Sequence, residues 1–199
     1  IKLLQPIVLT TGKEISISAT QNVTLDLNGN AIYCSSKSTQ FTNLGTFEII
    51  DTQENSLGLI TGWCNGLIKN TGSCTLTSGK LQLYGTISRT IINNLEQGNV
   101  IISGGNIEII TNRGIWHSYT WYCRDKSDAK GYGIYSTSSN NITITGGNLN
   151  CYNGDEIAIY VNNSDANNIA NVNISGDTVI KSNGTSSVGT GVIITNAKL

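Results

Sequence analysis

The feature that most constrains the fold is a short alternating apolar segment that stops at a polar or glycine step and then recurs. It occurs in the stretches LDLNGNAI (25–32), FEIIDTQ (47–53), TLTSGKLQL (75–83), IISGGNIEI (101–109), ITITGGNLNC (142–151) and VNISGDTVI (172–180). The step residues are Asn28, Asp51, Ser78, Gly104, Gly146 and Gly176, and they are spaced by 23, 27, 26, 42 and 30 residues. A further apolar motif precedes several of the steps, as in GLIKNTGS (66–73), GIYSTSSN (133–140) and AIYVNNSD (158–165). Three short apolar segments in a period near 26 residues predict one coil of a parallel β-helix, in which no coil is stable alone.

We therefore predict an all-β fold, a single-stranded right-handed parallel β-helix of about six to seven coils that spans residues 1–199 as one domain. Glycine and asparagine are expected at the corners, because they tolerate positive φ, and corner amides are expected to form ladders between coils. The expected core residues are Leu25, Leu27, Ile102, Ile144 and Ile174. The alternative is a β-sandwich of hairpins, but sandwich strands do not repeat the same corner at one period.

Composition excludes several classes of function. The net charge is −1 and only 13% of residues are charged, whereas nucleic-acid binding requires a basic excess. No apolar run exceeds about five residues, so we expect no membrane span. The chain contains no methionine, from which we expect a processed fragment of a longer extracellular protein.

The first part of the chain carries a family resemblance. The stretches VTLDLNGNAIY, NLGTFEIIDTQENSLGLITG and GLIKNTGSCTLTSGKLQL resemble the repeats of large bacterial cell-surface proteins with pectate-lyase-like right-handed β-helices. The resemblance covers roughly residues 15–182, and similar helices occur in phage tail spikes and fibres. It implies an extracellular adhesin-like or binding module, often one segment of a long stalk.

The anomalous spacing of 42 residues marks an insertion at residues 116–131, WHSYTWYCRDKSDAKG, which we expect to project from the stack as a loop. Clustered aromatic rings can stack on the apolar face of a pyranose while nearby polar groups pair with its hydroxyls. The candidate ligand-binding residues are Trp116, His117, Tyr119, Trp121, Tyr122, Arg124 and Asp125. The alternative is that these aromatic side chains simply cover the flank of the helix, with His117 an ordinary polar loop residue.

Catalytic signals are weak. The chain has one histidine and no Gly-His-Gly element, so the Ser-His-Asp and polygalacturonase-type arrangements have no support. Asp26, Glu48 and Asp51 fall on early coils, where an axial carboxylate row would suit calcium, but the Gly-Gly-x-Gly-x-Asp calcium repeat is missing. We therefore predict no catalytic residue, no metal site and no cofactor, and leave a structural calcium ion open.

Five cysteines occur at positions 34, 64, 74, 123 and 151, without the CxxC spacing of a zinc site. A Cys64–Cys74 bond would close a short loop, and a Cys123–Cys151 bond would tie the insertion to the following coil. The alternative for Cys74 and Cys151 is that they are small buried side chains on strands.

Together these observations favour a non-catalytic cell-surface adhesin-like or receptor-binding module, whose partner is a host or environmental glycan or a surface receptor. A structural stalk, filament or phage tail fibre segment that self-associates through the solenoid ends is the first alternative. A polysaccharide lyase or hydrolase is the second. All three place the protein outside the cell, on a cell surface or on a virion surface.

Overall fold

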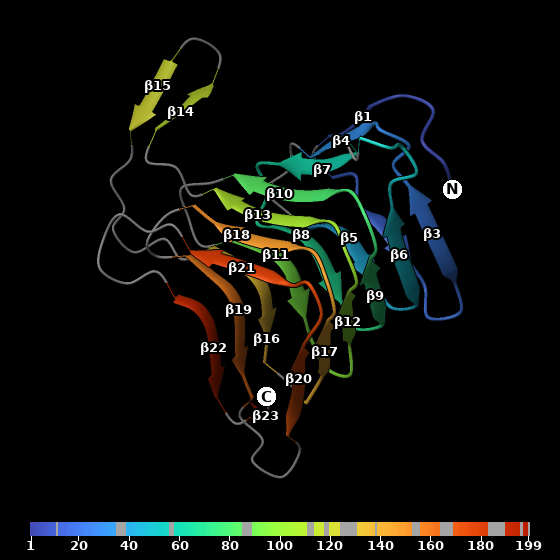
Figure 1. The fold of residues 1–199 in the computed structure, drawn as a ribbon. Helices are drawn as coiled ribbons and strands as arrows, with labels where there is room; N and C mark the ends of the chain where they lie inside the picture. Colours follow the sequence, from blue (N-terminus) through green and yellow to red (C-terminus); the bar gives the residue numbers. More distant parts are fainter. Residues whose placement is uncertain are drawn as a thin grey trace.

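The computed structural model has three parallel sheets of seven strands each, which wrap around one apolar core (Figure 1). It describes residues 1–10, 12–34, 39–55, 58–84, 89–110, 114–117, 120–123, 131–137, 139–152, 156–163, 169–182, 190–195 and 197–198. The chain visits the sheets in the same order on every pass, so the fold is a parallel β-solenoid. This confirms the predicted fold class, and seven strands per sheet agree with the predicted coil number.

Each coil contributes one strand to each sheet. Sheet 1 contains β1 (Ile7–Leu9), β4 (Ala31–Cys34), β7 (Leu59–Gly62), β10 (Lys80–Tyr84), β13 (Asn106–Ile110), β18 (Asn148–Cys151) and β21 (Val179–Ser182). Sheet 2 contains β2 (Ile15–Ile17), β5 (Thr39–Asn43), β8 (Gly66–Asn70), β11 (Arg89–Asn94), β16 (Gly131–Ser136), β19 (Glu156–Asn162) and β22 (Thr190–Thr195). Sheet 3 contains β3 (Asn22–Asp26), β6 (Thr46–Ile50), β9 (Ser73–Leu76), β12 (Asn99–Ile102), β17 (Asn141–Ile144), β20 (Ala170–Ile174) and β23 (Ala197–Lys198).

The core consists of inward-facing side chains that stack at the same register position in successive coils. In sheet 3 one such column is Leu25, Ile49, Leu76, Ile102 and Ile144, all of them buried. Alternate residues of a strand point to opposite faces, so this apolar column lines the interior while the residues between face outward. The predicted core residues are confirmed here, with Ile174 partly buried against the same cluster.

The corner between sheet 3 and sheet 1 requires positive φ, as the sequence predicts. Asn28 and Gly29 adopt φ of 48° and 71° in the first such corner, and Gly79, Gly105, Gly147 and Gly176 do so in later ones. At Gly147 an added Cβ would also lie 2.7 Å from the carbonyl oxygen of Gly105 in the previous coil. A side chain at this position would therefore meet both backbone strain and a clash.

The early carboxylates hold the first corners together and do not form a common cluster. Asp26 accepts hydrogen bonds from the amide and hydroxyl of Thr52, and Asp51 accepts hydrogen bonds from the amides of Gly29 and Gly58. Glu48 lies on the outer face of sheet 3. Within the described ranges no three acidic, histidine or cysteine side chains gather as a metal site would require. Asp26 and Asp51 therefore act as caps of the corner turns, whose backbone amides donate hydrogen bonds to their carboxylates.

The predicted amide ladder is confirmed at the corner between sheet 2 and sheet 3. The Nδ2 group of Asn43 donates to Oδ1 of Asn70 at 2.7 Å, and Nδ2 of Asn70 donates to Oδ1 of Asn94 at 2.7 Å. All three side chains are fully buried. The same amides also donate to backbone carbonyls of the turn, so the ladder satisfies buried polar groups in three successive coils.

The long spacing contains an antiparallel hairpin, β14 (Gly114–His117) and β15 (Thr120–Cys123), which pairs with itself and joins none of the three parallel sheets. The coil strands stop at Ile110 and resume at Gly131. The first residue of the predicted insertion at 116–131 lies inside β14, and its last residue begins β16. Aromatic residues, which have a high β propensity, contribute Trp116 to β14 and Trp121 and Tyr122 to β15.

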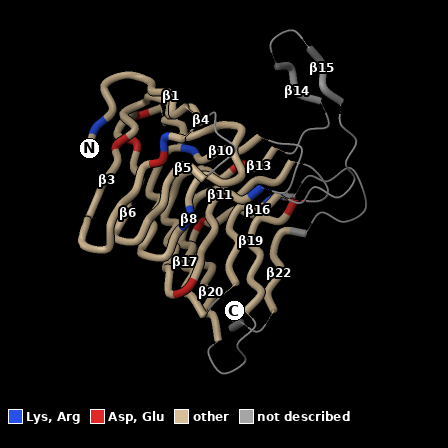
Figure 2. Tube along the Cα trace, turned by 180° about the vertical axis from the view of Figure 1, so that it is seen from behind, with Lys and Arg blue, Asp and Glu red and all other residues tan. Residues whose placement is uncertain are grey.

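The outer surface carries few charges. Figure 2 shows lysine, arginine, aspartate and glutamate scattered along the stack, with both signs present. In the part of the chain that the structure describes, no helix is long and apolar enough to cross a membrane.

Candidate functional site

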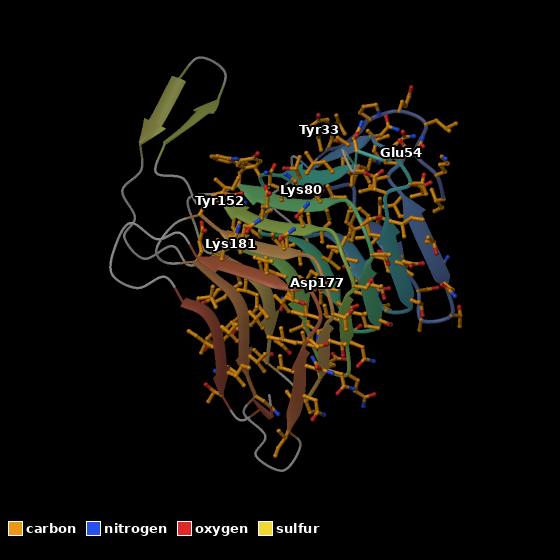
Figure 3. The ribbon with its side chains drawn as sticks, viewed as in Figure 1. Tyr33, Glu54, Lys80, Tyr152, Asp177 and Lys181 are labelled. Carbon is orange, nitrogen blue, oxygen red and sulfur yellow. The ribbon has the colours of Figure 1, made fainter. Side chains whose placement is uncertain are left out.

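The outer face of sheet 1 carries a row of side chains that occupy one register position in successive coils. From the N-terminal end this polar strip contains Val8, Tyr33, Thr61, Gln82, Glu108, Asn150 and Lys181. Neighbouring strands lie about 4.8 Å apart, so the strip runs continuously along the solenoid axis. Figure 3 shows Tyr33, Lys80, Tyr152 and Lys181 distributed over this face.

A hydrogen-bonded pair forms the centre of the polar strip. Nε2 of Gln82 donates to Oε2 of Glu108 at 2.8 Å, and Nζ of Lys80 lies 3.1 Å from the other carboxylate oxygen, Oε1. Glu108 is only 8% exposed although it faces outward, because neighbouring side chains pack around it. Its carboxylate is held in place by partners from the preceding coil, so little side-chain entropy remains to be lost on binding a ligand.

Two tyrosines border this pair. The hydroxyl of Tyr84 donates to Oε1 of Gln82 at 2.6 Å. Burial raises the pKa of Tyr84, and the negative charge of Glu108 raises it further. The pKa of Tyr152 is likewise raised, first by burial and then by the charge of Glu108 and a hydrogen bond to it. Both phenols therefore stay protonated at neutral pH and act as hydrogen-bond donors.

An aromatic edge runs beside the polar strip, at the end of the sheet 1 strands. Tyr84 pairs with Ile110, and the amide of Tyr152 donates to the carbonyl oxygen of Ile109, which places Tyr152 next to Ile110 in the following coil. Trp63 follows the last residue of β7 and precedes Tyr84 in the same row. Tyr152 is 40% exposed. Strand β13 ends at Ile110, within the aromatic edge, and the next described strand along the chain is β14 of the hairpin.

This arrangement has the chemistry of a surface that binds polar, ring-shaped molecules. Exposed tyrosine faces contribute apolar contact area, and the adjacent amide, carboxylate and ammonium groups contribute fixed donors and acceptors. The opposite charges of Lys80 and Glu108 nearly cancel, so the centre of the strip favours a ligand with hydroxyl groups.

The residues that the sequence predicts as ligand-binding lie in or beside the hairpin. The backbone register places Trp116 opposite Trp121 and His117 opposite Thr120, and Tyr122 opposite Ile115. The side chains of these hairpin residues lie outside the part that the structure describes. Tyr119, Arg124 and Asp125 are themselves outside the described residues, so their role in binding stays a prediction.

Arg89 is a buried cation beside the aromatic edge. It is the first residue of β11 and is 9% exposed. One Nη of its guanidinium donates to the carbonyl oxygen of Cys64, and its Cζ lies 5.7 Å from the centroid of the Trp63 ring. A desolvated cation–π contact contributes about 2 kcal/mol, whereas burying a cation costs several kcal/mol. The contact with Trp63 therefore offsets only part of the cost of burial.

Four cysteines are free, buried thiols: Cys34, Cys64, Cys74 and Cys151. Cys64 and Cys74 are both unpaired, so the short loop between them is not closed by a disulfide bond. Cys74 and Cys151 lie on strands and point into the core, as the alternative interpretation of the sequence holds. Because Cys151 is a free thiol, the predicted Cys123–Cys151 bond is not formed in this structure; the side chain of Cys123 lies outside the described residues.

Burial of these thiols makes the folded state less stable at alkaline pH. Burial raises the pKa of Cys74 from about 9 to about 12, which means that the folded state keeps a proton that the unfolded chain releases. The stabilisation is complete below pH 9 and is lost as pH rises from 9 toward 12. We expect Cys74 to account for about 1 kcal/mol of the loss in unfolding free energy between pH 8 and pH 10. Urea unfolding of the wild type and of Cys74→Ala at both pH values measures this, and equal losses in the two proteins would contradict it.

The centre of the polar strip was not among the residues predicted from the sequence. Gln82 and Glu108 stand at the middle of LQL and IEI in two stretches that were aligned with each other. In a β-helix equivalent positions stack, so this alignment already places the two side chains side by side. The sequence signal that could have identified this pair is a polar residue, flanked by two apolar residues, at the same position in two successive repeats.

Comparison of the chain with protein-family models, with curated proteins and with solved structures gave no match. The functional conclusion therefore depends on the geometry of the outer face of sheet 1.

Proposed function

We propose that the protein is a non-catalytic carbohydrate-binding module of an adhesin-like surface protein, and that the outer face of sheet 1 is its binding surface. The observation that carries this proposal is the Gln82–Glu108 pair, fixed by hydrogen bonds and flanked by the half-exposed Tyr152. A pyranose stacked on the tyrosine ring brings its hydroxyls against the neighbouring polar groups.

The geometry favours an extended glycan over a single sugar. The polar strip and the aromatic edge run parallel to the solenoid axis, and equivalent side chains recur at the spacing of the coils. Tyr33, which is 48% exposed near one end, and Tyr152 toward the other end offer separate stacking positions along one chain. The predicted aromatic residues of the hairpin, Trp116 and Trp121, would extend the same surface, because the hairpin follows β13, which ends at Ile110 within the aromatic edge.

An extracellular location and membership of the pectate-lyase-like group of surface proteins belong to this proposal. They are supported by the parallel β-solenoid and by the repeat stretches that resemble that group.

A glycan array tests the proposal. We expect the wild type to bind a defined set of glycans and Tyr152→Ala to lose at least about tenfold in affinity, because one stacking contact with a sugar ring is removed. The matched control is Tyr160→Ala, which removes a partly buried tyrosine from the outer face of sheet 2. Circular dichroism verifies that each variant is folded.

The Trp121→Ala variant separates the two candidate surfaces. Loss of binding in Tyr152→Ala alone places the glycan on sheet 1, and loss in both variants places it across sheet 1 and the hairpin. Loss in Trp121→Ala alone would contradict the role of sheet 1. No binding by the wild type would reject the carbohydrate proposal and favour the structural alternative, a stalk or fibre segment.

A further inference from the structure

Among the described residues, the guanidinium of Arg89 meets fewer partners than a buried cation needs. It has five N–H donors, and the structure provides one carbonyl acceptor, that of Cys64, and one ring face, that of Trp63. Its Nε atom is buried and has no hydrogen-bond partner. Arg89 forms no ion pair with any of the described carboxylates, in contrast to Lys80, which pairs with Glu108.

Among the described residues, the groups around Arg89 do not replace a counter-ion. The Cys64 thiol is protonated at neutral pH, because burial raises its pKa to about 11. Along sheet 2 the residue opposite Arg89 in the next coil is Gly131, which has no side chain. The following residue in this column, Glu156, is one coil further away and accepts a hydrogen bond from the amide of Tyr152 at 2.6 Å.

We propose that Arg89 is an oxyanion-binding site, which takes a carboxylate, sulfate or phosphate group on the Nε edge of its guanidinium. A planar guanidinium recognises such groups through two parallel N–H donors, and an anion there supplies the missing charge and the missing acceptor together. The guanidinium carbon lies 5.7 Å from the centre of the Trp63 ring, so the indole packs against the guanidinium from one side. The residue paired with Arg89 in the next coil, Gly131, carries no side chain that would compete for the guanidinium.

Two kinds of ligand carry such an oxyanion. One is a free inorganic anion that completes the corner as a structural ion. The other is an acidic group on a sugar bound at the adjoining surface, since Trp63 also begins the aromatic edge that leads to Tyr84 and Tyr152.

Calorimetric titration with sodium sulfate tests the site itself. We expect the wild type to bind one sulfate ion and Arg89→Gln to bind it at least tenfold more weakly. The Arg89→Lys variant keeps the charge but lacks the paired donors, so we expect an intermediate loss; it also provides the test if Arg89→Gln does not fold. The control is Lys69→Gln, which removes an exposed cation from sheet 2. No sulfate binding by the wild type, or equal binding by the wild type and both Arg89 variants, would overturn the proposal.

Matched oligosaccharides with and without a sulfate or carboxylate group identify the source. Tenfold tighter binding of the acidic member by the wild type, lost in Arg89→Gln, assigns the anion to the glycan. Sulfate binding with equal affinity for both oligosaccharides assigns it to a free ion. Binding of neutral oligosaccharides that Arg89→Gln retains while sulfate binding is absent would reject the oxyanion site and leave the proposed function intact.

Discussion

Replacement of Asn70 by alanine is expected to lower the free energy of unfolding by about 3–5 kcal/mol, because each buried polar group left unpaired costs about 1–3 kcal/mol. The Asn70 side chain accepts from Asn43 and donates to Asn94 and to two backbone carbonyls, those of Gly72 and Asn99. Its removal leaves partners unsatisfied in the coils on both sides. For a chain of this length the loss corresponds to a fall of roughly 10 °C in Tm.

Thermal unfolding followed by circular dichroism measures this effect. The matched control is Asn141→Ala, because Asn141 also belongs to an inter-coil amide ladder, with Asn99 and Asn171, but lies at the surface. We expect the control to change stability by no more than about 0.5 kcal/mol. Equal effects of the two substitutions would show that burial of the corner ladder is not what stabilises the stack.

Replacement of Phe47 by alanine is expected to lower the free energy of unfolding by about 3–5 kcal/mol, the usual cost of removing a buried phenylalanine ring. Phe47 is fully buried and stacks against Phe41, with ring centroids 5.4 Å apart. These two residues belong to adjoining strands of the same coil, β5 and β6, so the ring pair joins sheet 2 to sheet 3 inside the core.

Urea unfolding of Phe47→Ala and of Leu44→Ala tests this expectation. Leu44 lies in the turn between the same two strands but is 48% exposed, so its truncation is expected to cost less than about 1 kcal/mol. A small loss in Phe47→Ala would mean that the second coil is not packed as a continuous part of the core.

Most of the fold could be predicted from the sequence, because each sequence repeat corresponds to one coil of the solenoid. Apolar residues at equivalent positions, such as Ile102 and Ile144, stack in successive coils, and glycines such as Gly105 mark the corners that need positive φ. The buried amide ladder also followed from the sequence, since asparagine recurs at the end of the sheet 2 strands.

The candidate site was predicted less completely, because function on a solenoid depends on which outward residues become neighbours. Glu108 and Gln82 are separated by 26 residues, one full repeat, and only the register between β10 and β13 brings them together. The prediction from the sequence fell on the insertion, where the aromatic residues lie close together in the chain. It therefore missed Tyr84 and Tyr152, which become neighbours of the same carboxylate only through coiling.

The most direct test of the central claim is calorimetric titration of the best oligosaccharide from the array into the wild type, Tyr152→Ala and Tyr160→Ala. We expect equal affinities for the wild type and Tyr160→Ala, and at least tenfold weaker binding by Tyr152→Ala, which corresponds to about 1.4 kcal/mol. That result would establish the outer face of sheet 1 as the carbohydrate-binding surface. Equal affinity in all three folded proteins would contradict it.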